Sequence, residues 1–198
     1  MELPEKTAAI ILAAGSGSRF QSGTHKLLSL LHGRPVFQWA LETARTAGFD
    51  RTIVVTGAIR LPIYDPTVTV VHNPDFAQGQ MSSLRKALDA ARTFDVEAVV
   101  IGLGDQPFLT VDAWRQVGRS ASPIAVATYG DRRGHPVRLH HSIWDLLDDE
   151  GDVGARNLMR NAPHLVSELA CVGSPADIDT VEDLLLWNSS TNSSSTAP

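Results

Sequence analysis

The sequence predicts an α/β fold built on one doubly wound, mostly parallel sheet. Five short apolar or β-branched runs recur along the chain, and segments with helical periodicity lie between them. Strands that alternate with helices in this way are typical of parallel sheets with both faces covered. The chain has 198 residues, of which 43% are hydrophobic and 20% charged, so it can bury one core, and we expect a single domain over residues 1–187.

The expected strands are residues 8–12, 52–56, 68–72, 98–102 and 124–128. A first helix should cover residues 35 to about 47, because Pro35 suits a first helical turn and Gly48 a helix end. Two further helices should begin at Ser142 and Thr180. Each of these residues has an aspartate three positions later, a spacing at which the two side chains can cap free amides reciprocally.

Composition excludes several classes of function. The net charge of −5 and the pI near 5.7 argue against broad binding to nucleic acid or to an anionic membrane. The lone cysteine, Cys171, and the short N-terminal apolar run indicate a cytoplasmic protein without disulfides or a membrane span. Residues 188–198 are rich in Ser, Thr and Asn and lack apolar residues, so we expect a disordered tail.

The loop after the first strand has the composition of a phosphate site. It contains Ser16 between Gly15 and Gly17, and it is followed by Arg19 and then by Lys26. Small residues let backbone amides approach an anion, and the two cations can neutralise phosphate oxygens that the amides do not reach. The loop matches neither a P-loop nor the dinucleotide fingerprint. Taken alone, it is equally consistent with a plain connection between two elements.

Six short blocks in one order give the loop its context. They are Leu12, Ala13, Ala14 and Gly15 with Arg19 and Lys26; residues 73–74 (NP) with 79–84 (GQMSSL); 103–107 (LGDQP); 134–137 (GHPV); 151–156 (GDVGAR); and 177–184 (DIDTVEDL). Together these blocks resemble the molybdenum-cofactor cytidylyltransferase and guanylyltransferase group of small nucleotidyltransferases. The resemblance runs from about residue 8 to 187, although the segment 20–25 is longer than the family's usual spacing. It implies a Rossmann-like nucleotidyltransferase fold.

The resemblance implies a nucleotide site and a magnesium site. Arg19, Lys26 and Asp105 would be the catalytic residues. Asp105 follows an apolar strand and can hold Mg²⁺, which commonly binds one or two carboxylates together with waters and phosphates. A second metal contact would come from Asp177 or Asp179, with capping of the last helix as an equal alternative for Asp179. The nucleotide would be bound by these residues and by others of the first two blocks, namely Leu12, Ala13, Ala14, Gly15, Ser16, Gly17, Ser82 and Ser83.

Cations for an anionic acceptor occur in two turn-rich segments. Arg133 and His135 lie in residues 130–136 (GDRRGHP), between two expected strands, and Arg156 ends the block GDVGAR. An acceptor that carries a phosphate needs such cations. For each arginine, a solvated position on the surface is an equal alternative.

The leading functional hypothesis is transfer of CMP from CTP to molybdopterin, with release of pyrophosphate. Ala14, where glycine is the other choice, favours the cytidine-type members. The alternatives are a GTP-using guanylyltransferase, a nucleotidyltransferase for a sugar phosphate or other small phosphorylated metabolite, and an accessory protein that binds nucleotide or cofactor without turnover. A molybdoenzyme or an accessory protein is the expected downstream partner.

Overall fold

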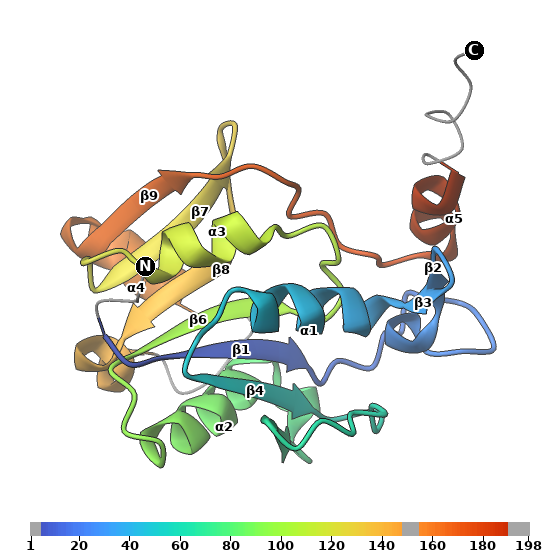
Figure 1. Cartoon of the computed structure of the whole chain (residues 1–198), viewed down its shortest axis with the longest axis horizontal. Helices are drawn as coiled ribbons and strands as arrows, with labels where there is room; N and C mark the ends of the chain where they lie inside the picture. The colour runs from blue at the N-terminus through green and yellow to red at the C-terminus, as the bar shows by residue number, and fades with distance from the viewer. Residues whose placement is uncertain (1–4, 148–154, 190–198) are drawn as a thin grey trace.

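One sheet of seven strands runs through the part of the chain that the computed structural model describes, residues 5–147 and 155–189 (Figure 1). Its order is β5-β4-β1-β6-β8-β7-β9. The strands are β1 (Thr7–Ala13), β4 (Arg51–Thr56), β5 (Val68–His72), β6 (Ala98–Leu103), β7 (Ile124–Tyr129), β8 (Arg132–His140) and β9 (Val166–Ala170). A separate two-stranded ribbon pairs β2 (Leu30–Leu31) with β3 (Arg34–Pro35).

The sheet is mostly parallel and doubly wound, as expected. Parallel pairing joins β5 to β4, β4 to β1, β1 to β6, and β7 to β9. Only β8 runs against its neighbours β6 and β7. The chain winds outward from β1 through β4 to β5 and then returns to place β6 on the other side of β1. In open α/β sheets such a reversal leaves a crevice at the carboxyl ends of the strands, and ligands bind there.

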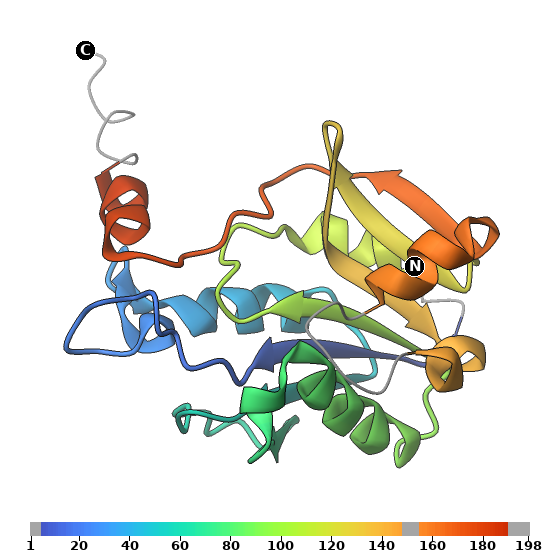
Figure 2. The same cartoon turned by 180° about the vertical axis from the view of Figure 1, so that it is seen from behind.

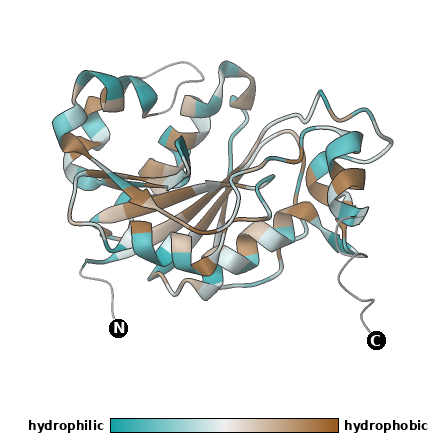
Figure 3. Cartoon of the chain, turned by 90° about the horizontal axis from the view of Figure 1, so that it is seen from above, coloured by the Kyte–Doolittle hydropathy of each residue, from teal (hydrophilic) through white to brown (hydrophobic). Residues whose placement is uncertain are grey.

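Helices cover both faces of the sheet, as the views from opposite sides show (Figures 1 and 2). The covering helices are α1 (Val36–Thr46), α2 (Gln80–Arg92), α3 (Val111–Gly118) and α4 (Arg156–Asn161). A fifth helix, α5 (Val181–Ser189), lies beside the β2–β3 ribbon. The core against α2 and α4 contains Ile10 of β1, whereas the core against α1 and α3 contains Ile11. Alternate residues of β1 thus enter two cores, which explains why the strand is apolar from Ala8 to Ala13. Figure 3 shows mostly hydrophobic strands in the interior of the molecule, between helices with hydrophilic outer faces.

All five expected strands are confirmed, with shifts of at most one residue at either end. The first expected helix is confirmed as α1, and Gly48 follows it with a φ of +82°, a conformation that suits glycine at a helix end. Reciprocal capping between Thr180 and Asp183 is also confirmed. The Asp183 amide donates to Thr180 Oγ1 at 3.1 Å, and the Thr180 amide donates to Asp183 Oδ2 at 2.8 Å.

Three expectations are wrong. Ser142 does not cap a helix with Asp145, because His140 caps the short 3₁₀ helix His141–Leu146 and accepts the Ser142 amide. The segment expected as a turn around Arg133 and His135 belongs to strand β8, whose polar residues and central glycine concealed its extended form. Helix α5 continues through Asn188 and Ser189, into the expected tail, and Asn188 binds the backbone of Leu30 and His32.

Residues 190–198 lie outside the described part of the chain, as does most of the block 151–156. Across residues 5–147 and 155–189, every helix is either too short or too polar to serve as a membrane span.

Candidate functional site

The glycine-containing loop begins where β1 ends, beside the carboxyl ends of β4 and β6. The Ala14 carbonyl accepts the Ala58 amide at 3.0 Å, which attaches the loop to the segment after β4. Gly57 packs directly beneath it, since a Cβ added there would lie 2.7 Å from the Ala14 carbonyl oxygen. Further along the loop, Gly17 has a φ of +62°, which only glycine adopts without strain. The loop therefore has a fixed conformation at the crevice.

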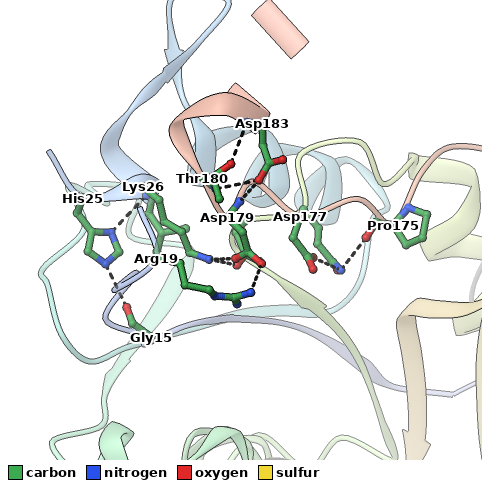
Figure 4. A network of polar contacts seen from close by, with 12 residues as sticks. Gly15, Arg19, His25, Lys26, Pro175, Asp177, Asp179, Thr180 and Asp183 are labelled. Atoms are coloured by element: carbon green, nitrogen blue, oxygen red, sulfur yellow. Dashed lines mark hydrogen bonds and ion pairs between the residues drawn. The ribbon is translucent and has the colours of Figure 1, made fainter. Parts of the chain in front are cut away.

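Lys26 lies between two carboxylates at the centre of the site (Figure 4). Its Nζ is 2.6 Å from Oδ2 of Asp105 and 2.8 Å from Oδ1 of Asp179. Burial alone would lower the pKa of Lys26, but the two carboxylates outweigh it and the pKa is raised. The lysine is therefore fully protonated near neutral pH. The longer segment 20–25 still places Lys26 in contact with Asp105.

Arg19 adds a second cation from the solvent side. Its guanidinium lies 2.9 Å from Oδ2 of Asp179, and its side chain is 75% exposed. An exposed pair of this kind stabilises the fold little. Arg19 is therefore available to move onto a bound anion, whereas Lys26, 11% exposed, stays in place.

The segment after β9 supplies Asp179 and holds it in place. The Ile178 amide donates to the Asp105 carbonyl at 2.9 Å, so the two acidic residues are connected through the backbone. Asp183, in the first turn of α5, accepts the Asp179 amide at 3.0 Å. Asp179 therefore does not cap α5 through its side chain, which faces the two cations instead.

Asp177 lies next to this cluster, between Asp179 and Pro175 (Figure 4). Its Oδ1 accepts a hydrogen bond from the Gln106 amide at 2.6 Å. Burial raises the pKa of Asp177, and repulsion by Asp105 adds to the effect. Of the two late aspartates considered for the metal, only Asp179 contacts the cations.

A cavity of about 240 Å³ collects most of the predicted site residues. Its lining includes Leu12, Ala13, Gly15, Ser16, Gly17, Arg19, Lys26, Asp105 and Asp179. A second cavity, of about 500 Å³, shares Leu12, Gly15, Ser16 and Asp105 with the first. It extends past Ala14 to the start of α2, where Ser83 lines it. Residues far apart in the sequence thus form one continuous depression at the crevice.

The two serines of α2 have different positions. Gly79, with a φ of +110°, precedes the helix, so neither serine is its N-cap residue. The side-chain amide of the buried Asn73 donates a hydrogen bond to each serine hydroxyl. Ser82 Oγ also donates to the backbone carbonyls of Asp75 and Gly79. Ser82 therefore supports the turn before α2, while Ser83 lines the second cavity. Asn73 belongs to the second block of the resemblance, and its buried side-chain amide holds both serines in place.

The predicted acceptor residues line a third cavity, of about 560 Å³. Arg133, His135 and Arg156 all reach it, and it meets the other two at Leu12. Arg133 also pairs with Glu168 at 2.5 Å. Burial and the positive charge of Arg156 lower the pKa of His135 to about 4, so its ring is neutral near pH 7.

The carboxylates at the centre could hold a divalent ion whose other ligands are waters and phosphates. Asp105 Oδ1 is buried and has no hydrogen-bond partner in the described residues. No group of three or more His, Cys, Asp and Glu side chains suited to a metal occurs in residues 5–147 and 155–189. Magnesium needs only one or two carboxylates when waters and phosphates complete its shell.

Sequence reasoning missed His25 and Gln106. The ring of His25 bonds the loop at Gly15, and Gln106 holds Asp177 and the Pro175 carbonyl. Both residues lie directly beside predicted site residues, Lys26 and Asp105. Adjacency in the sequence indicates that His25 and Gln106 lie near the site, but the sequence does not show where each side chain points.

Comparison with known proteins agrees with this geometry. The family model described as "MobA-like NTP transferase domain" matches residues 9–167, most of the chain and nearly all of the site. The chain belongs to this family. The MobA-like family comprises nucleotidyltransferases, and both the fold and the resemblance stated from the sequence are consistent with membership.

Individual members of the MobA-like family carry different names. Nicotine blue oxidoreductase of Paenarthrobacter nicotinovorans is 31% identical, over 88% of this chain and 93% of its own. Molybdenum cofactor cytidylyltransferase of Escherichia coli (strain K12) is 26% identical, over 89% of this chain and 92% of its own. The crystal structure of Rv0371C of Mycobacterium tuberculosis H37Rv, a complex with manganese, is 31% identical, with a TM-score of 0.73 over 93% of this chain and 99% of its own.

Proposed function

We propose that this protein is a magnesium-dependent nucleotidyltransferase that transfers CMP from CTP to a molybdopterin-type acceptor and releases pyrophosphate. The observation that carries the proposal is the position of the Lys26 ammonium, between Asp105 and Asp179 and beneath an amide-lined loop. This combination brings cations and metal-binding carboxylates to one cavity. Both are needed where a triphosphate is cleaved.

The triphosphate belongs in the cavity that Gly15, Gly17 and Lys26 line. Backbone amides in a glycine-containing loop can surround phosphate oxygens, and the buried ammonium adds a fixed positive charge. Arg19 is exposed and pairs with Asp179 at the rim of the cavity, so it can turn toward the leaving pyrophosphate. The fork geometry of its guanidinium suits that role.

The chemical step is an in-line displacement. An oxygen of the acceptor phosphate attacks the α-phosphorus of CTP, the bond from that phosphorus to the bridging oxygen breaks, and pyrophosphate carries away the electron pair. The second pKa of a phosphate monoester is about 6, so the attacking oxygen is already largely ionised at neutral pH. A protein base is therefore not required. Lys26 stabilises negative charge as it shifts toward the leaving group.

Asp105 would hold Mg²⁺ through its unpaired Oδ1, with Asp179 as the second carboxylate. When bound, the ion supplies charge neutralisation to the phosphates. Lys26 occupies the space between these carboxylates, so its ammonium and the metal would share their charge. The manganese complex of Rv0371C, which is 31% identical, supports a divalent ion in this fold.

The third cavity suits an acceptor with a flat ring system and an anionic group. Its lining combines aliphatic side chains, among them Leu84, Ile101, Val126 and Val137, with the cations Arg132, Arg133, Arg156 and Arg160. The faces of a pterin ring could pack on the aliphatic side chains, while polar lining residues such as Gln106 could bind the polar groups at its edge. The arginines could bind its phosphate. These features support a molybdopterin-type acceptor, and a sugar phosphate is the alternative that the assay below tests.

The choice of CTP rests on Ala14. Its side chain is buried and packs against the position of Gly57, so the methyl group limits how the backbone approaches a base. CTP should therefore raise the melting temperature more than GTP does, because at equal concentration the ligand that binds more tightly stabilises the fold more. A larger shift with GTP would move the assignment to the guanylyltransferase alternative.

Pyrophosphate release tests the proposal. Purified protein with Mg²⁺ is mixed with CTP, GTP, ATP or UTP, with and without molybdopterin, and compared with Asp105→Asn. We expect release that needs CTP and acceptor together, and a loss of about a hundredfold or more in kcat for Asp105→Asn. Asp112→Asn makes the same change at an exposed residue in the first turn of α3 that lines none of the three cavities described, and it should keep full activity.

Other outcomes would replace the proposal. Release with a sugar phosphate but not with molybdopterin would favour that runner-up. Binding of nucleotide without release would favour an accessory protein. Nicotine blue oxidoreductase is similar over most of the chain, so oxidation of NADH and NADPH is followed in parallel, and turnover there alone would identify a redox enzyme.

A further inference from the structure

We infer that His25 is a positioning residue that fixes the nucleotide loop against the catalytic lysine. The inference rests on the proposed function for its consequence, but its geometry stands independently. His25 precedes Lys26, and its half-buried ring lies between Lys26 and Gly15 of the loop (Figure 4).

The ring of His25 joins two elements. Its Nδ1 accepts the Leu27 amide at 3.2 Å and thereby caps the 3₁₀ helix that contains Lys26. Its Nε2 lies 3.1 Å from the carbonyl oxygen of Gly15. A ring nitrogen that accepts a hydrogen bond carries no proton, so the proton of the neutral ring is on Nε2, which donates to Gly15.

The bond to Gly15 determines where the loop amides point. In a planar trans peptide the carbonyl and the next N–H point in opposite directions. Because the Gly15 carbonyl faces the His25 ring, the Ser16 amide points away from it. Ser16 and Gly15 both line the central cavity. His25 therefore favours the loop conformation in which an amide is available to a phosphate.

Close packing reinforces this arrangement. A Cβ added at Gly17 would lie 3.2 Å from His25 Nε2 and 3.3 Å from Cγ of Lys26. The loop, the imidazole ring and the lysine stem are thus in mutual contact. Without the ring, the two glycines would have many more accessible conformations, and nucleotide binding would have to restrict them.

Two substitutions separate the two contacts. In His25→Asn the side-chain oxygen can replace Nδ1 as the cap of the 3₁₀ helix, but the side chain is too short to reach Gly15. In His25→Gln the side-chain amide nitrogen can take the place of Nε2 and donate to the Gly15 carbonyl. We expect His25→Asn to increase hydrogen exchange of the amides in residues 14–18 while the melting temperature changes little. His25→Gln should keep their exchange close to that of the wild type. Equal exchange in the wild type and both variants would overturn the inference.

Steady-state kinetics give the second readout. We expect His25→Asn to raise the KM for CTP by about fivefold to tenfold with kcat nearly unchanged, since one hydrogen bond is lost and ground state and transition state lose it alike. His25→Gln should restore the KM. A fall in kcat with unchanged KM in His25→Asn would contradict a positioning role. If the wild type turns over no nucleotide at all, the proposed function fails, while the exchange experiment still decides the role of His25.

Discussion

Lys26 shows how one residue can connect stability with chemistry. Its ammonium neutralises two carboxylates that repel each other at close range, and the attraction raises its pKa. The same charge is placed where a triphosphate would bind. A bound nucleotide and metal would therefore replace an existing set of ion pairs with another, rather than enter a site that lacks charge compensation.

His135 should make stability depend on pH. Its pKa is about 4 in the folded protein, against an ordinary value of 6.5, because burial and then Arg156 disfavour its charged form. The unfolded chain therefore binds a proton more readily, and stability is lost as pH falls below 6.5 toward 4. Between pH 7.5 and pH 5, the free energy of unfolding of the wild type should fall by at most about 2 kcal/mol more than that of His135→Gln, because glutamine does not titrate.

Urea unfolding of both proteins at several values between pH 7.5 and 5 provides the measurement. The same substitution at His164, which is exposed, is the control for loss of a histidine. Parallel pH curves for the wild type and His135→Gln would show that the folded protein does not disfavour the charged ring.

At the scale of elements, the site depends on loops that follow neighbouring parallel strands. The loops after β1 and β4 are packed so closely that Gly57 has no room for a side chain. A Cβ there would lie 2.7 Å from the Ala14 carbonyl oxygen and 2.8 Å from Cβ of Phe76. The glycine is needed for close approach and not for an unusual backbone angle, since it is absent from the residues with positive φ.

Gly57→Ala should displace the nucleotide loop. The added methyl group must move backbone at Ala14, so we expect a loss of about 1–3 kcal/mol of stability and a higher KM for CTP. Gly23→Ala adds the same methyl group where no atom lies within 4 Å, and it should change neither quantity. Urea unfolding and initial rates measure the two effects. Unchanged KM in Gly57→Ala would mean that the loop position does not limit nucleotide binding.

The sequence was most informative about elements with regular patterns. Periodicity found the parallel strands and α1, and the spacing of Thr180 and Asp183 found the start of α5. The first half of strand β8 was expected as a turn, because residues 132–136 are mostly polar and include a glycine. In its second half, the charge of the buried Arg138 is compensated by Glu5 and by the Ser122 carbonyl, and such pairing between distant segments carries no local signal.

The candidate site was predicted from the loop after the first strand, from Asp105 at a strand end and from the family resemblance, which pointed to Asp179. Lys26, Asp105 and Asp179 come together at the predicted edge of the sheet. The sequence did not show that Ser82 is engaged by Asn73, or that His25 faces Gly15. These contacts depend on the direction of individual side chains, which follows from tertiary packing.

At the scale of the whole molecule, helix α5 stabilises the segment that precedes it and carries Asp179. It packs beside the β2–β3 ribbon, away from the main sheet (Figure 1). Phe20, Leu31, Val36 and Ile178 form a small third core there, with Trp187 packed against it. The ring of Trp187 stacks on Phe108, with 3.9 Å between centroids. This helix therefore anchors the segment that carries Asp179.

Trp187→Ala should loosen that anchor. We expect a loss of about 1–3 kcal/mol in stability, because a large aromatic contact is removed from a partly buried position. The kcat/KM for CTP should also fall, since Asp179 loses support. Leu185→Ala in the same helix removes a side chain from a residue that is 62% exposed, and it should have little effect on either quantity. Chemical unfolding and initial rates compare the two variants. Normal kcat/KM in Trp187→Ala would show that Asp179 is held independently of α5.

The 153-residue separation between Lys26 and Asp179 also bears on how the protein comes into being. Contacts between such distant residues form late and slow the folding of a chain. During synthesis, all strands of the sheet are made by Ala170, before the segment that carries Asp179 exists. A nascent chain at that stage has its lysine and its loop but lacks one of the two carboxylates. Activity would therefore begin only once the last helix has been made and has docked.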